Sequence, residues 1–215
     1  MKWRIEAAVY GVKWAHDIAG VPSPIERTLF RQVLEAAKRL MGKHAQGQQA
    51  VSFDVTTKVV ENFNTPLASL SDLRTCFIFV IAFAGIMRSH EIINIKRSQI
   101  SILPDHVSIF CPVRKNDQRR QGHFVFIARL NNISCPVSVT EKLLAKLPVH
   151  PDQHLVCRLS SSGPPSLSAI GYSRVREIFR ATLSLFVEDC HNYGTHSLRK
   201  GGASAASAAG ISGEL

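Results

Sequence analysis

The chain has 215 residues, of which 45% are apolar and 20% are charged, and its formal net charge is +10. These proportions are typical of a globular protein with a sizeable core, so they exclude disorder, collagen and coiled coil for the whole chain. The basic excess does not specify a fold, but it predicts attraction to polyanions, with nucleic acid as the first candidate.

Three further features bear on the compartment in which the chain works. The longest apolar run, 75–87, is shorter than the about 20 residues that a bilayer-spanning helix needs. The first residues contain no apolar stretch of the kind that a secretory signal requires. The five cysteines are scattered without a Cys-x-x-Cys pair, which favours buried thiols over disulfides. We therefore expect a soluble intracellular protein without a membrane anchor, nuclear if the host is a eukaryote.

The N-terminal third of the chain is predicted to be helical. Apolar residues recur at helical spacing over 7–18. Ser23, Pro24 and Glu26 then form a helix-start signal, with a proline where its missing N–H is not needed. This signal opens a helix that ends before Gly42, and a third helix is expected over 52–62. The apolar residues expected to face inward on the second helix are Ile25, Leu29, Val33, Ala36, Ala37 and Leu40.

Thr65-Pro66 is interpreted as a domain boundary, which divides the chain into residues 1–65 and 66–215. The second part begins with a nearly all-apolar helix over 67–84, a composition that predicts burial on every side. Period-two alternation in three short runs, 100–102, 107–111 and 124–128, predicts a small antiparallel sheet. Further helices are expected over 89–95, 136–147, 173–188 and 197–209. The predicted fold is therefore mainly α with a small antiparallel β-sheet (α+β).

Four local patterns carry residues suited to holding a phosphate, and the fourth, the helical pair Arg176 and Arg180, fits an exposed surface better than a site. Arg88 follows the apolar helix, with Glu91 three residues later on the same helical face. A polar hairpin loop then carries Arg114, Lys115, Arg119 and Arg120. His196 and Arg199 lie one helical turn apart near a helix N-terminus, where free N–H groups favour an anion, and the following Gly201 and Gly202 permit close backbone approach. Taken alone, these patterns also fit an ion pair, a solvated turn and a core histidine.

In this order, the segments AFAGIMRSHEI, VRKNDQ and HSLRKGGAS resemble the motifs of the tyrosine recombinase (phage integrase) family. The segment AAVYGVKWAHDIAGVPSP further resembles recombinase-like proteins of animal genomes and their mobile elements. The family combines a helical core-binding domain with a catalytic domain of helices around a small sheet. The resemblance thus implies a core-binding, DNA-binding domain in residues 1–65 and a catalytic domain in residues 66–215.

The resemblance implies DNA strand exchange that needs no metal and no small-molecule cofactor. Arg88, supported by Glu91, and Arg199 would clamp the scissile phosphate, because guanidinium is always charged and binds phosphate at two atoms. Lys115 would protonate the leaving 5′ oxygen, and His196 would orient the phosphate or carry the proton of the nucleophile, a tyrosine. Further contacts to DNA are predicted for Arg27, Arg31, Lys38, Arg114, Arg119, Arg120, Arg176, Arg180 and Lys200.

The sequence departs from the family at that tyrosine, which should lie well beyond the His-x-x-Arg box. Tyr10, Tyr172 and Tyr193 do not match its position. We therefore expect a chain truncated at the C-terminus, and incomplete at the N-terminus, that grips duplex DNA without cleaving it, so whether it is an enzyme is left open. The alternatives are a host-recruited DNA-binding module that never needed catalysis and, less well supported, a scaffold for an acidic protein.

Other sequence features add no second site. His150, His154 and Cys157 are three zinc-ligand types without a fourth partner, so no metal site is predicted. Duplex DNA is the expected partner, together with self-association in a recombination synapse. No membrane partner is expected.

Overall fold

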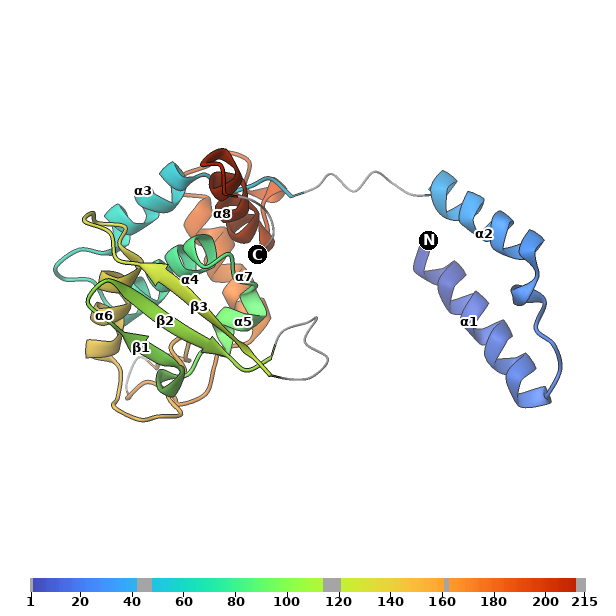
Figure 1. The fold of residues 1–215 in the computed structure, drawn as a ribbon, viewed down its shortest axis with the longest axis horizontal. Helices are drawn as coiled ribbons and strands as arrows, with labels where there is room; N and C mark the ends of the chain where they lie inside the picture. The colour runs from blue at the N-terminus through green and yellow to red at the C-terminus, as the bar shows by residue number, and fades with distance from the viewer. Residues whose placement is uncertain (1, 42–47, 114–120, 161–162, 212–215) are drawn as a thin grey trace. The chain divides into compact units, whose positions relative to one another are not determined.

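The computed structural model describes residues 2–41, 48–113, 121–160 and 163–211. The chain divides into two compact units, Met1–Gly47 and Gln48–Leu215 (Figure 1). This division differs from the boundary expected at residue 65, because helix α3 (Phe53–Phe63) belongs to the second unit. Its Val59 and Val60 are fully buried in the core of that unit, so the helix is held there by hydrophobic packing.

The first unit contains helices α1 (Lys2–Ala19) and α2 (Thr28–Met41), separated by the short 3-10 helix η1 (Pro24–Glu26). Ser23 caps η1 as predicted, and its hydroxyl accepts a hydrogen bond from the N–H of Ile25. The expected continuous helix from residue 24 is wrong, however, since Arg27 is extended and donates its N–H to Pro24 at 3-10 spacing.

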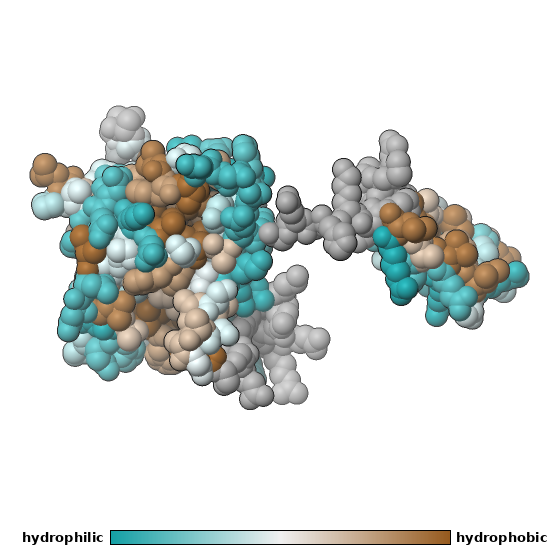
Figure 2. All heavy atoms as spheres, turned by 90° about the horizontal axis from the view of Figure 1, so that it is seen from above, coloured by the Kyte–Doolittle hydropathy of each residue, from teal (hydrophilic) through white to brown (hydrophobic). Residues whose placement is uncertain are grey.

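The inward face predicted for α2 is also wrong within this unit. Leu29, Val33 and Leu40 are 72%, 60% and 88% exposed, and hydrophobic residues are visible on the surface of the unit in Figure 2. Only Ile25 of the expected set is buried. Two helices offer too little mutual surface to cover an apolar stripe of this width.

The second unit is built around helix α4 (Leu70–Ala84). Ser69 and Asp72 form a reciprocal capping box that starts the helix, and every residue over 73–83 is buried. Helices α3, α6 (Pro136–Lys146) and α8 (His196–Ala208) pack against α4, as expected for a helix that is apolar all round.

Helix α7 (Tyr172–Leu183) completes the helical layer. Phe179 stacks on Phe79 of α4, with 5.5 Å between the ring centroids. The short helix α5 (Ser89–Ile93) also contacts α7. Two further 3-10 helices are η2 (Arg97–Gln99) and η3 (Cys190–Asn192).

The predicted antiparallel sheet is present, with strand order β1 (Ile100–Ile102), β2 (His106–Cys111) and β3 (His123–Ala128). One face buries Val107 and Ile109 in the core, as the alternation predicts, but on β3 it buries Ile127, whereas the alternation had selected the opposite face with Phe124, Phe126 and Ala128. Phe124 and Phe126 are exposed on the other face. The architecture is therefore mainly helical with a small antiparallel sheet, as expected.

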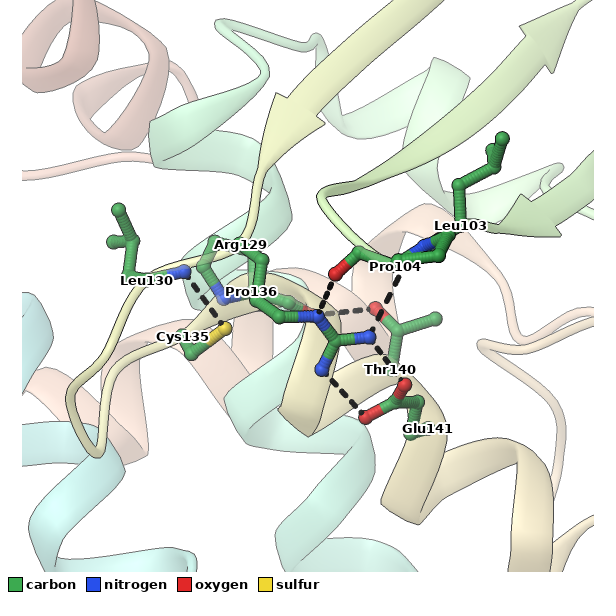
Figure 3. A network of polar contacts seen from close by, with 8 residues as sticks. All are labelled: Leu103, Pro104, Arg129, Leu130, Cys135, Pro136, Thr140 and Glu141. Carbon is green, nitrogen blue, oxygen red and sulfur yellow. Dashed lines mark hydrogen bonds and ion pairs between the residues drawn. The ribbon is translucent and has the colours of Figure 1, made fainter.

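A polar network fixes the sheet to α6 (Figure 3). Arg129 follows β3 and hydrogen-bonds through two nitrogens to both carboxylate oxygens of Glu141, at 2.6 and 3.1 Å. Its Nε donates to the carbonyl of Pro104 in the β1–β2 turn, at 2.7 Å.

Among the helices of the described ranges, none is both long and apolar enough to span a bilayer.

Candidate functional site

The turn after α4 delivers Arg88 to the start of α5. Gly85 ends α4, and Ile86 adopts a φ of +48°, a strained conformation for a β-branched residue. The side chain of Arg88 is 26% exposed and that of Glu91 is 6% exposed. Glu91 accepts hydrogen bonds from the backbone N–H and from Nη1 of Arg88, at 2.7 and 3.1 Å. The expected pair is therefore present and half-buried.

A cavity of about 360 Å³ lies beside this pair. Its walls come from the end of α4 and the turn after it, from Glu91, from β3 and from Arg199 of α8. Arg88 itself is outside this lining, but its partner Glu91 belongs to it. Glu91, which holds Arg88, and Arg199 are far apart in the chain but line the same cavity.

Two glycines allow α8 to lie close enough to α4 for this arrangement. A Cβ on Gly201 would collide with the carbonyl oxygen of Val51, and a Cβ on Gly202 would collide with that of Phe83. The close backbone approach that the sequence suggested is therefore present. It fixes the position of Arg199, one turn earlier on the same helix.

His196 is the first residue of α8 and is exposed, which excludes the core-histidine interpretation. It is not among the lining residues of the cavity. The preceding Thr195 is buried, and its hydroxyl lies 3.1 Å from the Tyr172 hydroxyl. Thr195 and Ser89 line one small hollow, so the starts of α8 and α5 are neighbours. His196 and Arg88 therefore come from adjacent helix starts.

The hairpin loop that carries Lys115, Arg114, Arg119 and Arg120 lies outside the described residues. The strand ends on either side of it are described. Cys111 is paired with His123, and His123 lines the cavity.

The other predicted DNA contacts are spread over both units. Arg27 and Arg31 are exposed in the first unit, and Lys38 is part of α2. Arg176 on α7 is exposed, whereas Arg180 is half-buried with an Nε that has no partner among the described residues. Lys200 is exposed and donates to the carbonyl of Gln48, at 2.9 Å.

His123 is a cavity residue that sequence reasoning missed. Its Nδ1 is buried and has no hydrogen-bond partner in the part of the chain that the structure describes. The available signal was its position, since it follows the basic loop directly and begins the strand of Phe124 and Phe126.

The histidines considered for zinc are engaged elsewhere. Nδ1 of His154 lies 2.8 Å from the carbonyl oxygen of Leu167, and Cys157 is buried. Among the described residues, no three His, Cys, Asp or Glu side chains gather as a metal-binding group.

The sequence of the chain is similar to that of a known recombinase. The chain is 26% identical over 195 residues to an integrase/recombinase xerD homolog of Selenomonas ruminantium, an alignment that covers 89% of this chain and 56% of that protein. No family model matches the chain.

Three solved structures have a similar fold. A XerA recombinase matches with a TM-score of 0.53 and 15% identity, over 94% of this chain and 61% of its own. The XerH site-specific recombinase bound to difH substrate matches with a TM-score of 0.52 and 16% identity, over 76% of this chain and 44% of its own. An FLP recombinase–Holliday junction complex matches with a TM-score of 0.53 and 14% identity, over 87% of this chain and 50% of its own.

The chain thus spans about half the length of the proteins that it matches. Its fold, a small sheet among helices, is similar to that of the XerA and FLP recombinases. The chain is therefore similar in sequence to an integrase/recombinase and similar in fold to several recombinases.

Proposed function

We propose that this chain grips duplex DNA by its backbone phosphates and that the second unit is the phosphate-binding part of a DNA strand-exchange domain. The observation that carries the proposal is the cavity between α4, α5, β3 and α8, where Arg199 and the Glu91 partner of Arg88 meet. Of the solved structures with a similar fold, XerH is bound to a difH substrate and FLP to a Holliday junction.

The chemistry follows from the charges that a phosphodiester develops. Displacement at phosphorus raises the negative charge on the non-bridging oxygens, and fixed cations stabilise that charge best when they are already in place. Arg88, held by Glu91, and Arg199, fixed by the glycine contacts of α8, meet this condition. In the proposal, Lys115 is the general acid for the leaving 5′ oxygen and His196 orients the phosphate or carries a proton.

A salt titration of duplex binding tests this proposal. Each neutralised phosphate contributes about −0.9 to the slope of log K against log salt, so Arg88→Ala and Arg199→Ala should each reduce the slope by about one. Both variants should weaken binding similarly across unrelated duplexes. Lys58→Ala, which removes an exposed positive charge of α3 outside the cavity, is the matched control. Parental affinity and slope in both site variants would disprove the phosphate clamp.

We further propose that the 215-residue chain binds DNA without cleaving it, whether as a strand-exchange protein or as a non-catalytic DNA-binding module. The tyrosine hydroxyls support this. No tyrosine is among the described residues that line the cavity. Tyr172 directs its hydroxyl to Thr195, Tyr193 packs against the core, and Tyr10 belongs to α1. A nicked suicide duplex should trap no covalent adduct, and a band that resists denaturation would contradict this.

The remaining parts of the proposal concern the first unit and the setting. Exposed Arg27, which precedes α2, and exposed Arg31, which shares α2 with Lys38, suit a helical DNA-binding unit. A nuclear location, a mobile-element origin and self-association in a synapse are proposed with it. Removal of residues 1–47 should weaken duplex binding and lower the salt slope; an unchanged slope would exclude the first unit from DNA contact.

A further inference from the structure

A second cavity, of about 480 Å³, lies at the other end of α4 and has a basic lining. It is bounded by the first turns of α4, by the segment 158–160 and by the start of α7. Arg74, Arg158 and Arg174 all line it, and its described lining contains no carboxylate. Ser71 and Gly171 also line the cavity.

Arg74 is the unusual residue of this cavity. It is 6% exposed and lies in the otherwise apolar stretch of α4. Its Nη1 donates to the carbonyl of Cys157 at 2.8 Å and its Nη2 to the hydroxyl of Ser71 at 3.3 Å. Its Nε is buried without a partner among the described residues. A buried guanidinium is normally paired with a carboxylate, so this positive charge lacks its usual compensation.

The neighbouring charges increase the imbalance. Arg158 is exposed. Arg174 forms an exposed ion pair with Glu177 at 2.8 Å, which neutralises part of one charge. Burial, and to a smaller extent the charge of Arg174, lower the pKa of Arg74 from its ordinary value, while Cys157 acts in the opposite direction. Asp72, the nearest acidic residue on α4, is occupied by the N–H and hydroxyl of Ser69.

We propose that this cavity is a binding site for the phosphate group of a small molecule, held by Arg74 at its base and by Arg158 and Arg174 at its rim. Guanidinium groups bind phosphate through charge-assisted hydrogen bonds, and a bound dianion would supply the compensation that Arg74 lacks. The cavity volume is in the range of small-ligand sites. A small ligand is favoured over duplex DNA because Arg74 is buried, whereas a duplex presents its phosphates to exposed side chains.

The proposal is independent of the DNA site, because none of its residues lines the first cavity. The test is isothermal titration calorimetry with inorganic phosphate at constant ionic strength, with acetate as the control anion. Arg158→Gln and Arg174→Gln should each weaken phosphate binding about tenfold, since each removes charge-assisted hydrogen bonds. Lys58→Gln, which removes an exposed cation of α3 outside the cavity, should bind phosphate like the parent.

Two more variants separate the two sites. Arg74→Met replaces the guanidinium with an unbranched apolar side chain and should abolish phosphate binding. Circular dichroism checks that this variant is folded. The double variant Arg88→Gln/Arg199→Gln should keep phosphate binding and lose duplex affinity. Parental phosphate affinity in both Arg158→Gln and Arg174→Gln, or loss of phosphate binding in the Arg88→Gln/Arg199→Gln variant, would overturn the proposal. Equal binding of acetate would overturn the assignment to phosphate.

Discussion

Glu91 holds Arg88 at two atoms, the backbone nitrogen at 2.7 Å and Nη1 at 3.1 Å. The carboxylate is the more buried of the two side chains, so it is the anchor and the guanidinium is the group that it positions. A guanidinium has five N–H donors, and one bond to Glu91 leaves others for an anion. The pair thus sets the direction of Arg88 before any phosphate arrives, as electrostatic preorganisation requires.

Removal of this anchor should weaken DNA binding although it makes the protein more positive. Glu91→Ala frees the Arg88 side chain and uncaps α5, so we expect about tenfold lower duplex affinity. Fluorescence anisotropy with a labelled duplex measures the change. Asp152→Ala removes an exposed carboxylate paired with Lys96 and is the matched control, which should bind as tightly as the parent or slightly more tightly. Equal or stronger binding by Glu91→Ala would refute the positioning role.

The contact between α8 and α4 should tolerate no added methyl group. In Gly202→Ala, the new Cβ meets the carbonyl oxygen of Phe83, which is backbone and cannot rotate away. We expect a loss of about 2–3 kcal/mol in the free energy of unfolding, measured by urea denaturation. Gly171→Ala is the control, since a Cβ there meets nothing within 4 Å. Parental stability in Gly202→Ala would show that α8 does not pack this closely.

The elements with strong local patterns were predictable from the sequence. The stretch that becomes α4 has one apolar run, and apolar residues occupy every second position of β1 and β2, so periodicity predicts the helix and these strands. In β3 every residue from 124 to 128 is apolar, so periodicity cannot tell the buried face from the exposed one. Arg88 and Arg199 were also predictable as candidates, because a rigid helix end and a helix start fix where such side chains project. Their approach to one cavity depends on long-range contacts of Gly201 and Gly202, which no local pattern encodes.

The predictions that differ from the structure also failed because long-range packing decided the outcome. Thr65-Pro66 breaks a helix, but Val59 and Val60 on its N-terminal side pack with the core of the second unit, and packing decides where a compact unit begins. The periodicity of α2 indicates an apolar face without showing what covers it. Arg74 was passed over because a single charge in an apolar run does not change its period.

The ion pair between Arg129 and Glu141 should make stability depend on pH in the acid range. Its hydrogen bonds to Arg129 hold the pKa of Glu141 below its ordinary value of 4.5. The carboxylate therefore stabilises the fold fully above about pH 5 and loses this effect as the pH falls through the lowered pKa. Glu141→Gln should lower the free energy of unfolding at pH 7, and the difference from the parent should vanish at about pH 2.

A double-mutant cycle with Arg129→Gln isolates this pair from the other carboxylates that titrate in the same range. The coupling energy between the two positions, obtained from urea denaturation at each pH, should be present at pH 7 and absent at low pH. A coupling energy that stays constant down to about pH 2 would mean that the two side chains do not form this ion pair in solution.

The thiols should differ sharply in reactivity. Cys76, Cys111, Cys135 and Cys157 are buried, whereas Cys190 is partly exposed. Burial raises the pKa of Cys76 to about 12 and also raises the pKa of Cys157, so neither forms thiolate near neutral pH. With a disulfide reagent at pH 8, one thiol should react quickly in the native protein and all five in guanidinium chloride. Cys190→Ser should remove the fast phase; a fast phase that survives would show that the core around α4 is open to solvent.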